Sequence, residues 1–434
     1  YLTAASLRCG AAPEAVEPLA VFSTFGAIVR ATFFRLLLLS VVLGNTTAAS
    51  AQGFRDQFKD PLDGRFDASS FLADNAYGFL PVPIIITDPA VDGGLGAVGL
   101  LFHETEEQKE QRLKALRESE DGARYLLPPN VSAVAGAYTG NDSWFLGGGH
   151  MGFFRQGRMR YMGGGGFGDV NLDFYGEGDV EFTRPIELNT RAGMILNSLK
   201  FKLGDSNFFA GPTQRFVSAR IEPVTLGDLD GSFLPPALQP PWQDIMTRLM
   251  TQDVVLSALG AIVEYDNRDN FFSPHAGYQY SVEHLWYRDE IGSDIDYELL
   301  TLSGHNYWNL GERFRAGLRI AADYASTSSL LPPFATPSIA LRGIPAMRYQ
   351  GNAVVVAEAE VTWQIDPRWS VNVFAGAGRA ANDLDELDEQ PTRVTKGGGF
   401  RYLIARRYGF EMGLDVARGP EDTVFYIQAG TAWR

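Results

Sequence analysis

The chain has 434 residues, of which 45% are hydrophobic and 12% aromatic, and its formal net charge is −15. This acidity argues against a nucleic-acid partner, because recognition of nucleic acids needs a basic face. No apolar run reaches the length of about 20 residues that a membrane-spanning helix needs, which argues against helical membrane spans.

The start of the chain has the pattern of a secretory signal. Two arginines precede an apolar stretch over residues 36–44, and small residues follow at 49–51. This order is typical of a signal peptide, and we expect cleavage before Gln52. Residues 1–51 are therefore interpreted as an upstream extension plus a signal peptide, with a buried apolar helix as the alternative. Cleavage would remove Cys9, the one cysteine of the chain.

Residues 52–90 are expected to form a short segment ahead of the first regular strand. The aspartates Asp60, Asp63 and Asp67 in this segment do not have the spacing of a calcium-binding loop. We interpret them as part of a turn that caps the domain that follows.

From residue 91 to the end of the chain, stretches of alternating apolar and polar residues are separated by turn residues. In residues 353–365 the odd positions are apolar, while Glu358 and Glu360 lie on the opposite face. A period of two indicates a β-strand, because successive side chains of a strand point to opposite faces of the sheet. The sequence therefore predicts an all-β fold over residues 91–434.

The stretch over residues 313–324 carries Arg313, Arg315 and Arg319 on its polar face, and the stretch over residues 408–416 alternates in the same way with Glu411 and Asp415 on its polar face. In a soluble sandwich such a face would meet water, whereas in a membrane barrel it would line the lumen. Charged residues inside strands, aromatic residues at strand ends (Trp433 among them) and the alternation of short turns with long connections favour the barrel. We predict an antiparallel transmembrane β-barrel with these three arginines in its lumen.

Seven short turns alternate with eight longer connections, which predicts 16 strands. The first strand is placed at residues 91–102 and the last at 423–433. One short strand is placed between the turn at Gly176 and a connection at residues 184–190. The long connections are assigned to the outer side, and the first of them holds a charged, helix-like stretch over residues 103–124.

Three stretches of the sequence resemble motifs of the BamA/TamA family of outer-membrane barrels, the bacterial surface antigen type. They are the turn DNRDNFFSPHAG, the loop ALRGIPAMRYQG and the C-terminal strand pair GLDVARGPEDTVFYIQAGTAW, and the resemblance covers roughly residues 60–434. The matching motif residues are Asp266, Arg268, Asp269, Pro274 and Gly277 in the turn, and Arg342 and Gly343 in the loop.

The resemblance implies that the loop between strands 11 and 12 folds into the lumen. It also implies that Arg342 of this loop is held there by Glu358 and Glu360 on the barrel wall. The family usually has an aspartate in the next strand, where this sequence has Gly376. The same contacts are also compatible with a purely structural plug.

For function, the resemblance implies a bacterial outer-membrane barrel that helps proteins or lipid enter or cross the membrane through a weak seam between the first and last strands. Residues 52–90, then periplasmic, are too short for the polypeptide-binding repeats of the family, which indicates a short branch without them. We predict no enzyme activity, cofactor or metal site, because the five histidines are scattered and hydrolase motifs are missing. The glycine run at 163–168 fits a dinucleotide motif only formally, because no helix follows it.

Two other functions remain open from the sequence. The first is a passive or gated channel of the porin type, in which Arg313, Arg315 and Arg319 would form an electrostatic filter. The second is a structural barrel that docks a separate periplasmic partner or forms a homodimer. Outer-membrane lipid is an expected partner in each case, and no client or solute is identified.

Overall fold

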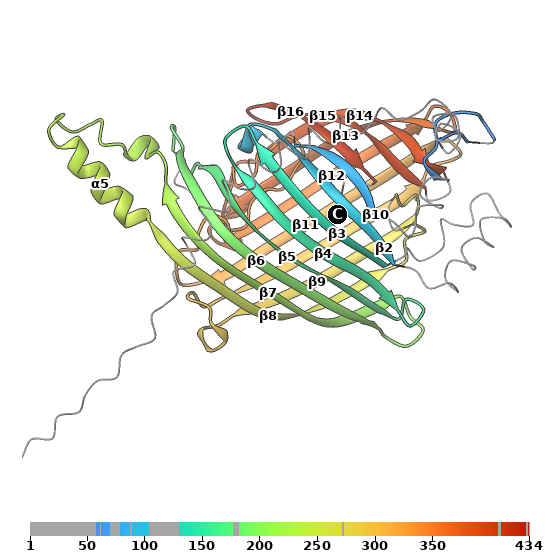
Figure 1. Ribbon diagram of the computed structural model, residues 1–434, viewed down its shortest axis with the longest axis horizontal. Helices are drawn as coiled ribbons and strands as arrows, with labels where there is room; N and C mark the ends of the chain where they lie inside the picture. The colour runs from blue at the N-terminus through green and yellow to red at the C-terminus, as the bar shows by residue number, and fades with distance from the viewer. Residues whose placement is uncertain are drawn as a thin grey trace, which may run out of the picture. The chain divides into compact units, whose positions relative to one another are not determined.

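Sixteen β-strands form one antiparallel sheet, in which each strand pairs with the next along the chain (Figure 1). The computed structural model describes residues 58–60, 62–69, 79–86, 89–103, 130–176, 182–270, 273–406, 409–430 and 433. The predicted signal segment and nearly all of the charged stretch at 103–124 lie outside these residues. The strands are β1 (Phe79–Ile86), β2 (Gly94–His103), β3 (Asn130–Thr139), β4 (Trp144–Phe154), β5 (Met159–Phe174), β6 (Ile186–Lys202), β7 (Phe208–Pro223), β8 (Gln252–Asp266), β9 (Gly277–Tyr287), β10 (Tyr297–Asn309), β11 (Phe314–Thr327), β12 (Ala353–Gln364), β13 (Trp369–Ala381), β14 (Arg393–Ala405), β15 (Phe410–Arg418) and β16 (Thr423–Ala429).

The helical elements lie in the connections. The α-helix α5 (Gln239–Met250) lies between β7 and β8, and the 3-10 helices are η1 (Pro89–Val91), η3 (Gly227–Leu229), η4 (Asp289–Ile291) and η5 (Leu384–Glu386). None of the helices in the described part of the chain is both long and apolar enough to cross a membrane.

The predicted all-β fold with 16 strands is confirmed, but two errors of assignment cancel in the count. The barrel begins with β1, inside the segment 52–90 that we expected to precede it. This strand was missed because Pro81 and Pro83 argue against a strand in sequence. The extra strand after Gly176 is wrong, since β5 pairs directly with β6 and one connection joins them.

The two ends of the barrel carry different connections. We call the end with the β11–β12 and β15–β16 connections the loop end, and the end with the β12–β13 and β14–β15 turns the turn end. Because consecutive strands run in opposite directions, β2 joins β3 and β4 joins β5 at the turn end. The prediction that these two connections lie with the long outer loops is therefore wrong.

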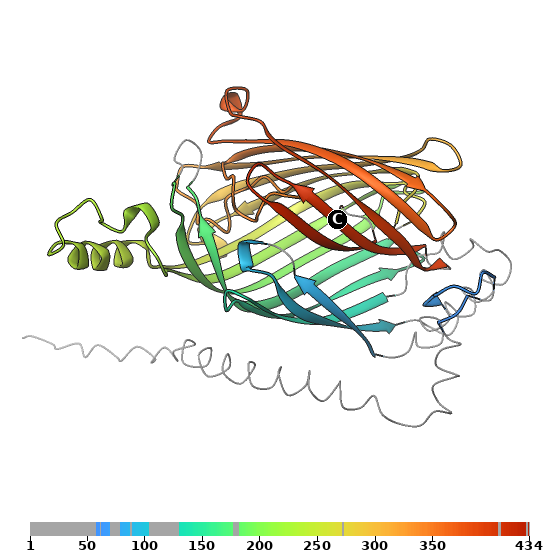
Figure 2. The same cartoon turned by 90° about the horizontal axis from the view of Figure 1, so that it is seen from above.

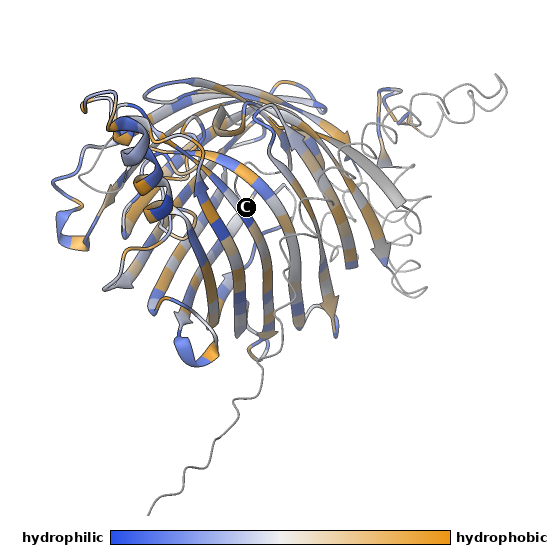
Figure 3. Cartoon of the chain, turned by 60° about the vertical axis from the view of Figure 1, so that its left-hand side comes forward, coloured by the Kyte–Doolittle hydropathy of each residue, from blue (hydrophilic) through white to orange (hydrophobic). Residues whose placement is uncertain are grey.

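The two faces of the strands differ, and the alternation is visible as bands of hydropathy along each strand (Figure 3). Glu358 of β12 lies opposite Arg319 of β11 in the strand register, and both face the lumen. On the outward face, large apolar side chains such as Ile195, Val373 and Phe425 are exposed. An apolar outer face is the pattern of a barrel surrounded by lipid.

The sheet does not close fully. Among the described residues, β1 and β16 form the two ends of the strand order and share no ladder, although they face each other across a seam (Figure 2). Every residue of β1 has a ladder partner in β2. In an antiparallel pair only every second residue exchanges hydrogen bonds with its partner. Because Pro81 and Pro83 have no N–H, we assign these hydrogen bonds to the even-numbered residues of β1. The nitrogens of Pro81 and Pro83 therefore face the seam, and they carry no hydrogen to donate.

Glycine is concentrated where β4 and β5 pair. Three consecutive positions join glycine to glycine across the two strands, Gly147 with Gly166, Gly148 with Gly165 and Gly149 with Gly164. A Cβ on Gly147 or Gly166 would lie 2.6–2.7 Å from the ring of Phe145, which covers this patch from the lumen. The run at 163–168 that fits a dinucleotide motif is therefore part of a strand.

Candidate functional site

The connection between β11 and β12, residues 328–352, folds into the lumen. It forms a small hairpin in which the N–H of Ile339 donates to the carbonyl of Tyr349 at 2.9 Å. Leu331 of this loop packs on inward residues of β7–β10, while Ile339, Leu341 and Ile344 pack against β12. The apolar residues of the loop thus form a core inside the lumen. This burial explains why a connection between two strands is rich in apolar residues.

Arg342 is the centre of the arginine clamp, which we define as Arg342 with Glu358, Glu360 and Asp415. Its Nε and Nη2 donate to Oε1 of Glu358 at 3.0 and 2.7 Å. Its Nη1 donates to Oε2 of Glu360 at 2.9 Å and to Oδ2 of Asp415 at 2.7 Å. The guanidinium also lies 3.5 Å from the ring centroid of Phe374.

The surroundings of Arg342 keep its guanidinium protonated. The residue is only 8% exposed, and such burial alone would lower its pKa. The carboxylates of Glu360, Glu358 and Asp415 outweigh burial and raise the pKa of Arg342 above its ordinary value. The structure therefore brings together the arginine and both carboxylates that the resemblance implied.

Asp415 was not assigned to the clamp from the sequence, although its alternation in β15 placed it on the polar face. It is 0% exposed and accepts from Nη1 and Nη2 of Arg401 at 2.6 and 2.8 Å. At Gly376, where the family has an aspartate, a Cβ would lie 3.0 Å from Leu341 of the loop. The clamp thus contains a third carboxylate, Asp415, although position 376 carries none.

We expect Gly376→Asp to destabilise the barrel by about 1–3 kcal/mol, because the new side chain would overpack against Leu341 and Thr395. The measurement is the urea midpoint followed by tryptophan fluorescence. Gly376→Ala, which adds bulk without charge, is the control and should cost less. A Gly376→Asp variant as stable as the wild type would mean that the loop does not pack here as described.

Gly343 fastens the loop to the last two strands. Its backbone φ of +95° is a value that residues with a side chain rarely adopt. A Cβ at this position would lie 2.9 Å from the backbone nitrogen of Gly419. Its N–H donates to the hydroxyl of Tyr426 in β16 at 2.9 Å. The close approach of two glycines therefore joins the loop to the C-terminal side of the seam.

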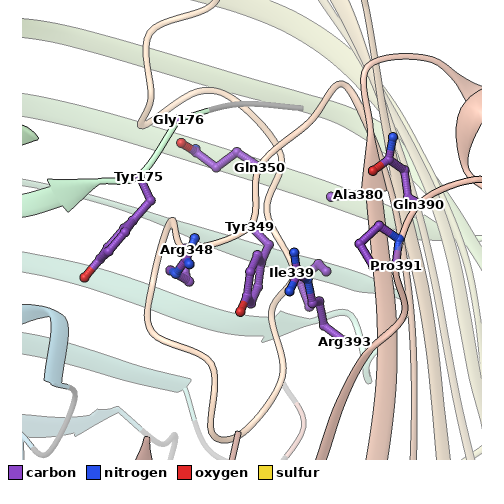
Figure 4. Close-up of a pocket in the computed structure, with 10 residues that line it drawn as sticks. All are labelled: Tyr175, Gly176, Ile339, Arg348, Tyr349, Gln350, Ala380, Gln390, Pro391 and Arg393. Atoms are coloured by element: carbon purple, nitrogen blue, oxygen red, sulfur yellow. The ribbon is translucent and has the colours of Figure 1, made fainter. Parts of the chain in front are cut away.

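A second ion pair joins the same elements. Arg348 contacts Glu421 of the β15–β16 connection at 2.6 Å, and Figure 4 shows it between the rings of Tyr175 and Tyr349. Burial would raise the pKa of Glu421, but hydrogen bonds from Arg348 and Tyr349 outweigh burial and lower it. Burial and the contact with Glu421 raise the pKa of Tyr349 to about 12.

The residues of the predicted turn motif lie together between β8 and β9. Nε of Arg268 donates to Asp266 at 2.9 Å, and the carboxylate of Asp269 accepts the N–H of His275 at 2.9 Å. Gly277 has a φ of +105°, and Pro274 is buried. These contacts hold the turn in shape at the turn end, and none of them involves a residue of the arginine clamp.

The predicted basic strand does not form an open filter. Arg315 pairs with Glu411 at 3.2 Å, and Arg319 donates to the carbonyl of Ala340 in the loop at 2.7 Å. Arg313 is exposed just before β11 begins. Two of the three arginines thus hold other parts of the barrel in place.

The N-terminal segment binds to the turn end through the N-terminal clasp, which we define as Asp60, Asp63 and Asp67 with Arg368 and Arg406. Arg368, which is buried, contacts Asp63 at 2.7 Å and Asp67 at 2.6 Å and also pairs with Asp60. Arg406 contacts Asp63 at 2.8 Å. The hydrogen bond from Arg368 lowers the pKa of Asp63 to about 2. The three aspartates of the predicted cap therefore form ion pairs with Arg368.

Trp433 does not lie where the sequence placed it. Strand β16 ends at Ala429 rather than at 433, and Trp433 is buried in the lumen. Its indole N–H donates to Oε1 of Glu358, and its ring lies over Gly317, where a Cβ would be 2.6 Å away. The glycine leaves room for the ring, so an aromatic predicted for the outer surface becomes part of the surroundings of the clamp.

The carboxylates of the clamp accept hydrogen bonds from arginines, so the clamp fastens the loop to β12 and β15, while the contact of Gly343 with Tyr426 fastens it to β16. Within the described ranges, no three carboxylate, imidazole or thiol groups lie close enough together to hold a metal ion.

No family model and no curated protein matches the chain. Among solved structures, it is similar to BamA from Haemophilus ducreyi lacking POTRA domains 1-3, with a TM-score of 0.49 and 12% identity over 89% of this chain and 82% of that one. It is also similar to CdiB from Acinetobacter baumannii and CdiB from Escherichia coli, each with a TM-score of 0.49 and 10% identity over 81% of this chain. The chain spans 59% and 62% of the length of those two proteins.

Proposed function

We propose that the protein is a bacterial outer-membrane barrel that helps polypeptide segments or lipid enter the membrane through the seam between β1 and β16. The observation that carries the proposal is the unsealed seam itself. An unpaired strand edge is a template for another strand, because its free N–H and C=O groups need partners. By the register with β2, the odd-numbered residues of β1 turn their carbonyls toward the seam, while Pro81 and Pro83 cannot donate to β16.

The inward loop beside β11–β15 supports the seam, rather than the lumen, as the working part. The loop of residues 328–352 occupies the interior and is fastened to β12 and β15 by the arginine clamp. It also holds β16 through Gly343 and Tyr426. One side of the seam is therefore anchored to the loop, and the other side, β1, is free to separate from it.

Two further observations agree with this role. The apolar outward face fits a lipid environment, and no step of the proposed process requires a catalytic group. The motifs around Arg268 and Arg342 resemble those of barrels that insert or translocate proteins. A porin-like channel fits less well, because Arg315 and Arg319 are engaged by partners inside the barrel.

Cross-linking the seam is the test. Cysteines replace Ile85 in β1 and Phe425 in β16, both exposed on the outward face, in a Cys9→Ser background. A reducible bis-maleimide then joins them in vesicles that contain the full chain. We expect the insertion rate of an unfolded client barrel of about eight strands to fall about tenfold and to recover on reduction.

The control pair is Leu414→Cys with Ile427→Cys, which are register partners within β15 and β16 and should leave insertion unchanged when linked. Client insertion that continues at the wild-type rate with the seam completely cross-linked would refute the proposal.

A further inference from the structure

Away from the turn end, the lumenal wall of β5–β8 is largely apolar, unlike the charged wall of β11–β15. The inward residues here include Met162, Met194, Leu196, Val217 and Ile262, as their register and their position around one cavity show. Met162 is 51% exposed and Met194 43% exposed, although neither faces the outer surface. Apolar side chains left uncovered inside a barrel are unfavourable unless something apolar covers them.

These residues line a cavity of about 830 Å³. Phe334 and Ala335 of the inward loop and the ring of Trp433 also line it. A predominantly apolar cavity of about 300–1,000 Å³ is the usual size of a site for a small organic ligand. The cavity is therefore large enough for an aliphatic chain.

The wall of the same cavity also carries a cluster of charged groups toward the turn end. Arg160 contacts Glu264 at 3.1 Å and Asp266 at 2.9 Å, and Lys200 contacts Glu264 at 2.7 Å. Among the described residues of this cluster, the cations Arg160, Lys200, Arg215 and Arg268 face the carboxylates of Glu264, Asp266 and Glu283, so four positive charges stand against three negative charges.

Polar atoms without partners lie beside this cluster. Ser198 and Thr213 are register partners on the inward face, and neither hydroxyl has a hydrogen-bond partner among the described residues. Thr213 is buried, and Nε of Arg160 also lacks a partner within the described ranges. Buried polar atoms are normally satisfied, and of these three residues Ser198 and Arg160 also line the cavity, so a polar ligand atom would be favoured at this end of it.

We propose that the cavity binds a single-chain amphiphile with an anionic head. The aliphatic chain lies along Met162, Met194 and Leu196, and the carboxylate or phosphate head lies at Lys200 and Ser198. The chain covers the exposed apolar wall, and the head neutralises the residual positive charge. This ligand site is separate from the proposed work of the seam and does not rest on it.

The test uses the full chain in vesicles and palmitic acid that carries a photoreactive diazirine. Labelled residues are mapped by mass spectrometry with and without excess competitor. We expect saturable labelling of inward residues of β5–β8, reduced about tenfold by palmitate or by lysophosphatidate, and much less by hexadecanol. Competition by palmitate alone would identify a carboxylate head, and competition by lysophosphatidate alone a phosphate head.

Variants on neighbouring residues provide the matched control. Met194→Trp narrows the apolar part of the cavity and should strongly reduce saturable labelling, whereas Val263→Trp, on the outward face of β8 and away from the residues that line the cavity, should not. Lys200→Gln should reduce the preference for the charged competitors over hexadecanol. Labelling that no competitor reduces, or that hexadecanol reduces as strongly as palmitate, would overturn the proposal even if every variant folds.

Discussion

Arg342→Ala is expected to lower the free energy of unfolding by about 3–5 kcal/mol and to open the lumen to ions. The substitution would leave Glu358 and Asp415 buried without the charge that all three carboxylates of the clamp share. Asp415 would keep Arg401, whereas among the described residues the hydrogen-bond partner left to Glu358 would be the indole of Trp433. Without the guanidinium at its centre, the clamp would no longer hold the loop against β12.

Two measurements check this expectation. Urea unfolding reports the change in stability, and single-channel recording in a planar bilayer reports the state of the lumen. We expect brief, unstable openings for the wild type and large, steady conductance for Arg342→Ala. Glu360→Ala should have a smaller effect than Arg342→Ala, because Glu358 and Asp415 would still hold the arginine.

Arg313→Ala is the matched control, since it removes the same charge from an exposed position. Steady, ion-selective conductance in both the wild type and Arg342→Ala would show that the loop is not a plug. It would favour a porin-like channel.

Arg368→Ala is expected to release the N-terminal segment from the barrel. Asp60 and Asp67 are buried against this arginine, and removing one partner of a buried ion pair costs about 3–5 kcal/mol. Limited proteolysis in detergent micelles should therefore cut the segment of residues 58–69 much faster than in the wild type, while the barrel itself stays resistant.

The N-terminal clasp should also respond to pH. The folded pKa of Asp63 is about 2, below its ordinary value of 3.8, because Arg368 stabilises the carboxylate. A lowered pKa means that the contribution of Asp63 is complete above about pH 4 and is lost as the pH falls toward 2. Proteolysis of the wild-type segment with an acid-stable protease should accelerate over this range.

The control for the N-terminal clasp is Arg65→Ala, which breaks the exposed pair with Asp366. Exposed pairs contribute about 0–1 kcal/mol, so this variant should behave like the wild type. If Arg65→Ala and Arg368→Ala were cut at the same rate, the buried contacts of Arg368 would not be what holds the segment.

The alternation of residues predicted much of the fold because a period of two is a local property. It placed Glu358, Arg319 and Asp415 on one face, and all three lie in the lumen. The contact between Arg342 and Glu358 required the family resemblance, since a loop has no period that shows where it folds. Asp415 could not be assigned to the clamp, because its distance to Arg342 depends on the curvature of several strands.

Other features were hidden for different physical reasons. Strand β1 was missed because Pro81 and Pro83 argue against a strand, and such prolines are tolerated only at an unpaired edge. The apolar lumen of β5–β8 was missed because both faces of these strands carry apolar residues, among them Met194 inside and Ile195 outside. Alternation cannot then distinguish the lumen from the outer surface.

The glycine pairs between β4 and β5 have a mechanical consequence. Where Gly147, Gly148 and Gly149 meet Gly166, Gly165 and Gly164, little more than backbone connects the two strands. Changing the angle between these strands would disturb few packed side chains, so bending should cost little there. On the other side, β12, β15 and β16 are fastened to the inward loop. We expect the barrel to bend at the pair β4–β5. Strands β1–β4 would then move together as one unit, while the C-terminal strands stay in place.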